Sequence, residues 1–267
     1  MGGGLVATLY ILQNERYMKI KIMVLLLFMT GYLLSQNIDA DFRNVNVFYG
    51  LGNNHLIDEY ISRNEYTGIS NSYGLNWIDR NNSRQTEVGF DFKTIKNLKN
   101  MNNEAATYDF LIDYKYLYNI YSGDIFNKPL NIFLGPDFGF YIHYRDQRVA
   151  SSSKALSVAS LFFANAALNA VSNISESFSV SGSLSFSVLS FTIRTPSMED
   201  NNNIPTPVAL LSIPKVLNLN ASVFASYNIL NNMWLQLGYR LIFLQINKWD
   251  YFRLISDNLV IQCGVNF

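Results

Sequence analysis

The chain has 267 residues and carries 20 acidic and 20 basic side chains, so its formal net charge is zero. A nucleic-acid partner would call for a basic patch, and this balance argues against one. The single cysteine excludes an internal disulfide and a zinc site built from several thiolates, and no metal or cofactor is expected. Charged residues make up only 15% of the chain, below the ~25% of soluble domains. With 19 Phe and 17 Tyr, this composition suits a protein whose outer surface does not face water.

The N-terminal segment predicts export. From Met18 the chain reads MKIKIMVLLLFMTGYLLSQ, in which two lysines precede an apolar run and then the small residue Ser35. This order is typical of a secretory signal peptide, predicted over residues 18–35, and the mature chain is then 36–267. A transmembrane anchor is the alternative, but the apolar run is shorter than the ~20 residues that a spanning helix needs. Residues 1–17 are predicted to be an upstream translation artefact.

The mature chain shows repeated strict alternation of apolar and polar residues. A closed antiparallel β-barrel spans a membrane with strands that alternate lipid-facing apolar and lumen-facing polar side chains. From 177 to 188, for example, every odd residue is Ser, whereas the even residues include Phe178, Leu184 and Phe186. Strong alternation also covers residues 107–120, 132–144, 217–229 and 258–267, and weaker alternation covers 45–52, 69–78, 85–94 and 234–246.

A soluble β-sandwich also alternates, and it is the competing fold. Three features favour the barrel. The alternating segments often run for 11 to 14 residues, whereas strands most often have about 5–6 residues. Their apolar face is rich in Tyr and Phe, as in interfacial girdles. Tight connections at 80–83 and 230–233 alternate with long ones, predicted to be outer loops, at 53–65, 95–104, 146–176 and 248–256.

The strand count follows from the parity of the alternation. Nine segments are visible, but single-chain bacterial barrels nearly always have an even number of strands. At Val188–Leu189 the apolar phase shifts by one residue, which indicates either a β-bulge or a chain reversal. A reversal without Gly, Asn or Pro is poor turn chemistry, so the bulge is favoured. A further strand is then sought within Pro205–Lys215, giving ten strands, with eight as the alternative.

Taken together, these features resemble those of bacterial outer-membrane β-barrel proteins. The signal peptide, the tandem long strands and the terminal segment NLVIQCGVNF, which ends in Phe267, carry the resemblance. LGPDFGFYIHY and GYRLIF are similar to segments of uncharacterised small barrels of the porin-like type. The resemblance implies a location in the outer membrane, contact with its lipid, and recognition of Phe267 by the barrel-assembly machinery. It specifies the class of protein and leaves the function open.

Inward-facing charge is the first candidate site. By parity, the lumen receives a set of charged side chains that is expected to form an ion-paired network: Glu87, Asp91, Lys93, Asp109, Asp113, Lys115, Asp137, His143 and Arg240. A filled, salt-bridged interior is the favoured interpretation, because barrels of this size enclose little free space. The predicted function is therefore a non-enzymatic structural, binding or narrow-pore protein. A small-solute or ion channel through these charges is an alternative.

His143 raises a second alternative, a lipid hydrolase. Outer-membrane phospholipases and lipid A deacylases carry a His and a Ser two residues apart on a strand, so that the imidazole can activate the hydroxyl. Here the second residue after His143 is Arg145, which departs from that pattern. No catalytic residue is therefore assigned, and the chain is not expected to be an enzyme.

The connection at 146–176 is the longest of the predicted outer loops. Its middle, KALSVASLFFANAALNAV, is rich in good helix formers, so a short helix is predicted there. Such a helix would pack over the barrel mouth, lie on the membrane or meet a surface partner. This loop is therefore the predicted contact for any partner.

Overall fold

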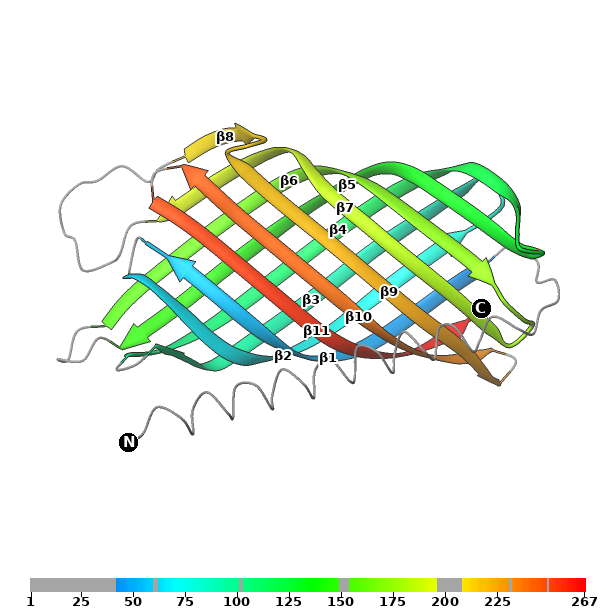
Figure 1. The fold of residues 1–267 in the computed structure, drawn as a ribbon, viewed down its shortest axis with the longest axis horizontal. Helices are drawn as coiled ribbons and strands as arrows, with labels where there is room; N and C mark the ends of the chain where they lie inside the picture. Colours follow the sequence, from blue (N-terminus) through cyan, green and yellow to red (C-terminus); the bar gives the residue numbers. More distant parts are fainter. Residues whose placement is uncertain are drawn as a thin grey trace.

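The computed structural model describes residues 42–59, 62–100, 103–148, 154–195, 208–230, 232–248 and 250–267, which form eleven β-strands (Figure 1). They are β1 (Phe42–Asp58), β2 (Ser62–Arg80), β3 (Arg84–Asn100), β4 (Asn103–Ile125), β5 (Lys128–Arg148), β6 (Lys154–Asn173), β7 (Phe178–Thr195), β8 (Val208–Ser212), β9 (Val216–Leu230), β10 (Met233–Lys248) and β11 (Asp250–Asn266). Within these ranges, no helix is long and apolar enough to cross a membrane. The predicted signal peptide lies outside the described residues.

The strands close into an antiparallel barrel. Each of β1 to β7 pairs with the next strand, β9 pairs with β7 and β10, and β11 pairs with β10 and β1. Ten of the eleven strands in the described ranges make up the wall. β8 pairs with the end of β7, from Leu189 to Ile193, and lies beside the wall at the start of β9. The predicted all-β barrel of ten strands is confirmed.

The tenth strand of the wall is not where the sequence placed it. Residues 154–173, predicted as a helix within an outer loop, form β6 between β5 and β7. Its odd residues from Ser157 to Val171 are buried in the lumen, and its even residues, such as Phe162, face outward. The helix and the 146–176 loop were therefore wrong predictions. Alanine favours helix by less than 1 kcal/mol per residue, so pairing with two neighbouring strands overrides it.

The bulge is confirmed, whereas the search for a wall strand in Pro205–Lys215 was wrong. Ala164 pairs with Leu189 and Asn165 pairs with Ser187, so Val188 is the extra residue that shifts the apolar phase of β7. Within Pro205–Lys215 the chain forms β8, which has five residues and does not contribute a wall strand.

The barrel has two ends, named here by their connections (Figure 1). At the turn end, β2, β4, β6 and β9 finish, and short turns at 81–83, 126–127 and 174–177 join neighbouring strands; Phe267 also lies there. At the loop end, β1, β3, β5, β7 and β10 finish. Strands occupy most of the predicted long loops at 53–65, 95–104 and 248–256. These loops were overestimated because the strands continue after their alternation weakens.

Side chains separate into an apolar outer face and a mixed lumen. Large apolar residues face outward along the whole wall, among them Tyr49, Phe90, Tyr114, Phe138 and Tyr227. Inside, near the loop end, thirteen buried residues form one cluster, called here the apolar plug: Leu56, Tyr66, Ile95, Leu98, Ala105, Leu161, Phe163, Leu211, Val216, Leu244, Ile246, Phe252 and Leu254. The lumen is therefore packed at its loop end.

Candidate functional site: the barrel lumen

The structure places all nine sequence-predicted lumen charges inside the barrel, as two groups of three, one further pair and Asp137. The first group is a row of directly paired positions on β3, β4 and β5. Lys93 Nζ lies 2.9 Å from Asp109 Oδ2, and His143 Nδ1 lies 2.6 Å from Asp109 Oδ1. His143 is 0% exposed, and its ring packs edge-on against Phe252 of the plug. Asp109 thus joins a buried ammonium group and a buried imidazole beneath the apolar plug.

Four residues next to this row were missed by the sequence analysis. Arg145 lies over the ring of Tyr66 and donates a hydrogen bond of 2.6 Å to Gln147 Oε1, and Asp58 Oδ2 lies 3.8 Å from its guanidinium. Gln147 in turn donates to the Tyr66 hydroxyl. The signal was available, because Arg145 and Gln147 continue the odd, inward parity of His143. Because no apolar residue follows Tyr144 in this strand, the predicted strand ended there and left both residues outside it.

The second group lies nearer the turn end. Lys115 Nζ lies 2.9 Å from Glu87 Oε1 and 3.0 Å from Asp113 Oδ2, so one ammonium group joins two carboxylates. Glu87 and Lys115 occupy directly paired positions on β3 and β4. Asp91 and Arg240 form a further pair across the lumen at 2.6 Å, and the Arg240 guanidinium lies over the Phe48 ring. These ion pairs connect β3, β4 and β10 inside the barrel.

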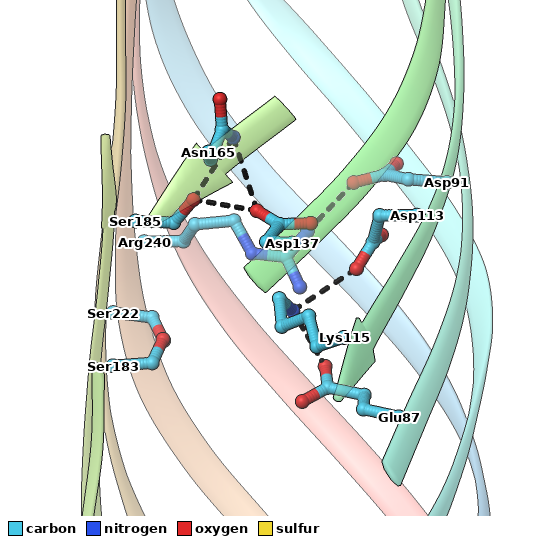
Figure 2. Close-up of polar contacts among 10 residues, drawn as sticks. All are labelled: Glu87, Asp91, Asp113, Lys115, Asp137, Asn165, Ser183, Ser185, Ser222 and Arg240. Carbon is cyan, nitrogen blue, oxygen red and sulfur yellow. Dashed lines mark hydrogen bonds and ion pairs between the residues drawn. The ribbon is translucent and has the colours of Figure 1, made fainter. Parts of the chain in front are cut away.

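Asp137 is the direct register neighbour of Lys115, and its hydrogen bonds run to a different pair of side chains (Figure 2). It is 2% exposed, and its Oδ2 accepts hydrogen bonds from the Asn165 amide and the Ser185 hydroxyl. Its Oδ1 has no hydrogen-bond partner, and within the described ranges no cation lies close enough to form an ion pair with it. Asn165 and Ser185 are uncharged, so they were not among the inward-facing charges predicted from the sequence.

A cavity of about 290 Å³ occupies the turn-end half of the lumen. Its lining reaches the exposed turn residues Asn82, Glu176 and Ser177, so the cavity opens at the turn end. Figure 2 shows its two sides: Ser183 and Ser222 lie across the lumen from Glu87, Lys115 and Asp113. The two hydroxyls are 2.7 Å apart. One side of the cavity is therefore rich in hydroxyl groups and the other is charged.

Further toward the loop end lies the apolar plug, with a much smaller space at its boundary. A space of about 30 Å³ remains between the Lys93–Asp109 pair and side chains that include Leu161, Phe163 and Leu244. A single water molecule occupies about this volume. Over the described residues, the lumen is thus an open chamber at the turn end and is packed with side chains at the loop end.

The remaining sequence candidates lie outside the lumen. Phe267 follows β11 at the turn end, exposed, and its amide donates to the Arg43 carbonyl at 3.2 Å. Cys263 lies on the outward face of β11. His55, near the loop end, pairs with Glu65. Over the residues that the structure describes, no group of His, Cys, Asp and Glu is arranged to hold a metal ion.

Known proteins resemble this chain in fold. No family model and no curated protein matches the sequence. Among solved structures, the outer-membrane protease OmpT from Escherichia coli is 13% identical, with 87% of this chain and 99% of that chain covered and a TM-score of 0.45. The translocator domain of autotransporter NalP from Neisseria meningitidis is 12% identical (98% and 99% covered, TM-score 0.42). Neisserial surface protein A is 15% identical (84% and 97% covered, TM-score 0.36). Values this low leave the function to be argued from the geometry of this chain.

That geometry defines the class of protein. In a bilayer every backbone polar group must be bonded internally, and a closed barrel achieves this. Here the pairing of β1 with β11 closes the sheet, and the outward face is apolar and aromatic. The chain is an integral outer-membrane β-barrel protein.

Proposed function

We propose that this protein is a closed, non-enzymatic barrel with a structural or binding role, and that it does not conduct ions or solutes. The observation that carries the proposal is the packed loop-end half of the lumen. The apolar plug and the Lys93–Asp109–His143 row lie in series with the cavity. A solute that enters at the turn end therefore meets a dead end.

Displacing this packing is costly. The thirteen plug residues are each at most 5% exposed, so a water-filled path would have to rehydrate them. Exposing one large apolar side chain costs about 1.5–3 kcal/mol, and several would have to move together. The ion-paired row adds charges that are held in place by short contacts. Thermal opening of a continuous pore is therefore expected to be rare.

The lipid-hydrolase alternative is not supported by the position of His143. The Asp109–His143 pair is the kind of base and orienting carboxylate that an activated serine needs. However, His143 is completely buried in the lumen beneath the plug, and its ring faces Phe252. A lipid ester on the outer surface of the barrel would be separated from this imidazole by the wall. The pair is better explained as part of the packed interior.

The predicted partners stay proposals. Recognition of Phe267 by the assembly machinery is consistent with its exposure at the end of the last strand. The predicted surface contact at 146–176 loses its basis, since 146–148 and 154–173 belong to β5 and β6. The connection between them, 149–153, lies outside the described residues.

Planar-bilayer recording tests the closed barrel. The purified protein should insert without a stable open level, because the plug blocks the lumen. A variant with Leu161, Phe163 and Leu244 changed to Ser should conduct, since it opens and wets the boundary between cavity and plug. Its currents would also show that the assay detects an open lumen. Large, steady channels from the unmodified chain would contradict the proposal and favour a pore.

A further inference from the structure

We propose that the turn-end cavity is a binding site for a small hydroxylated solute that carries a primary ammonium group, the chemical class of the amino sugars. The proposal deepens the closed-barrel function, on which it rests, by assigning a ligand class to the chamber. It is carried by the unbonded Oδ1 of the buried Asp137 carboxylate, by the other buried polar atoms left unbonded on the cavity lining, and by the size of the cavity.

The charge of the lining favours a cation. Among the described residues, five acidic and three basic side chains line the cavity, a net charge of −2: Glu87, Asp91, Asp113, Asp137 and Glu176 against Arg80, Lys115 and Arg240. Lys115 and Arg240 are already paired with Glu87, Asp113 and Asp91. Asp91 and Asp137 each keep one buried oxygen, Oδ1, unbonded, but Asp91 is already paired with Arg240 through Oδ2. A buried carboxylate oxygen without a hydrogen bond is costly, and an ammonium group that donates to Asp137 Oδ1 would offset that cost.

The buried side-chain atoms of the lining that lack a hydrogen-bond partner are all oxygens, in the residues that the structure describes. Five buried side-chain oxygens along the cavity, in residues that the structure describes, have neither a hydrogen-bond nor an ion-pair partner: Asn46 Oδ1, Asp91 Oδ1, Asp137 Oδ1, Asn220 Oδ1 and Gln262 Oε1. Each is an acceptor. The complementary ligand is therefore rich in N–H and O–H donors. An ammonium group supplies three donors, and ring hydroxyls supply the others.

The opposite side of the chamber and its volume fit the rest of such a molecule. Ser183 and Ser222 present hydroxyls that both donate and accept, so they can bond to a hydroxylated ligand. The 290 Å³ chamber lies at the lower end of the ~300–1,000 Å³ of small-molecule pockets. This size suits one monosaccharide and excludes a large chain. The mouth at Asn82 and Glu176 makes the site reachable from the turn end.

Isothermal titration of the intact barrel in detergent tests the proposal with a matched pair of ligands. D-Glucosamine and D-glucose differ at one position, where an ammonium group replaces a hydroxyl. Glucosamine should bind saturably and glucose at least about tenfold more weakly, because a hydrogen bond to a charged group is worth about one tenfold step or more. This comparison uses the unmodified protein and does not depend on the folding of any variant. Equal binding of both sugars, or no saturable binding of glucosamine, would overturn the proposal.

Two variants locate the ammonium group. Asp137→Asn keeps the shape of the side chain and its bonds to Asn165 and Ser185 but removes the charge, and it should weaken glucosamine binding at least about tenfold. Asp79→Asn makes the same change on the outer face at the turn end, next to Arg43, and should leave binding unchanged. If the folded Asp137→Asn barrel binds glucosamine as tightly as the unmodified protein, the assignment is overturned. It is also overturned if KCl saturates the site and glucosamine does not compete with it. Conductance is measured in the separate planar-bilayer experiment. A protein that conducts and still binds glucosamine would therefore contradict the closed barrel and leave the binding site standing.

Discussion

The two halves of the lumen use the same ten strands and are built differently. Within β10 the inward positions nearer the turn end are Trp234, Gln236, Gly238 and Arg240, whereas those nearer the loop end are Ile242, Leu244 and Ile246. The turn-end half keeps a chamber of about 290 Å³, and the loop-end half is filled by the apolar plug. Alternation decides which side chains enter a barrel, and their size and polarity decide whether the barrel is open.

The halves also differ in how they treat charge. At the turn end the Glu87–Lys115–Asp113 group borders the cavity and keeps 13–18% of its side-chain surface exposed. In the Lys93–Asp109 pair below the plug the values are 6% and 4%. Ion pairs cost more to break where water cannot replace the lost partner. The comparison therefore predicts that equivalent substitutions destabilise the packed half more.

The largest loss of stability is expected for Asp109→Ala. The change leaves the buried ammonium of Lys93 without its carboxylate partner and removes the acceptor of His143. The free energy of unfolding should therefore fall by about 3–5 kcal/mol. Urea titration of the barrel folded in detergent measures this loss. Asp79→Ala breaks the exposed pair with Arg43 and should cost less than about 1 kcal/mol. Similar losses for both variants would mean that water reaches the row around Asp109.

A smaller loss is expected in the plug itself. Leu254→Ala removes a completely buried side chain from β11 and leaves a cavity, with an expected cost of about 2–4 kcal/mol. Leu259→Ala, on the same strand, truncates an outward side chain that is 42% exposed, so it leaves no internal cavity and should cost clearly less. The same urea titration compares them. If Leu254→Ala lowers the free energy of unfolding no more than Leu259→Ala does, the plug is not tightly packed.

The wall of the barrel was largely predictable, since alternation is a property of the sequence. The parity that assigned Lys93, Asp109 and His143 to the lumen also located the bulge at Val188. β6 was missed because its alternating residues are mostly Ala, Ser and Asn, whose small contrast in hydropathy hides the period of two. Their helix propensity then pointed to the wrong element. Pairing with β5 and β7, which decides the outcome, is not a local property.

The division of the lumen was less predictable. The expected interior was filled throughout, and parity alone gives no depth for a side chain in a tilted barrel. Asp137 shows the limit: the sequence puts it with Lys115, and the register makes them direct neighbours, but its hydrogen bonds come from Asn165 and Ser185. Those two residues lie on β6 and β7, and without β6 their approach to Asp137 could not be foreseen.

The smallest effect is expected where water can take over a lost hydrogen bond, and β7 offers a matched pair of serines to show it. Ser183 bonds to Ser222 beside the cavity, so Ser183→Ala leaves a hydroxyl that water can reach and should cost less than about 1 kcal/mol. Ser187, four residues further toward the loop end, is 1% exposed and accepts a hydrogen bond from the backbone amide of Asn218.

Ser187→Ala makes the same chemical change on the same face of the same strand, but it leaves that buried amide without its acceptor, which should cost about 1–3 kcal/mol. Urea titrations of the two variants, run side by side, give the difference directly. A Ser183→Ala loss that equals or exceeds the Ser187→Ala loss would mean that the turn-end chamber holds no exchangeable water, and the contrast between the two halves of the lumen would fail.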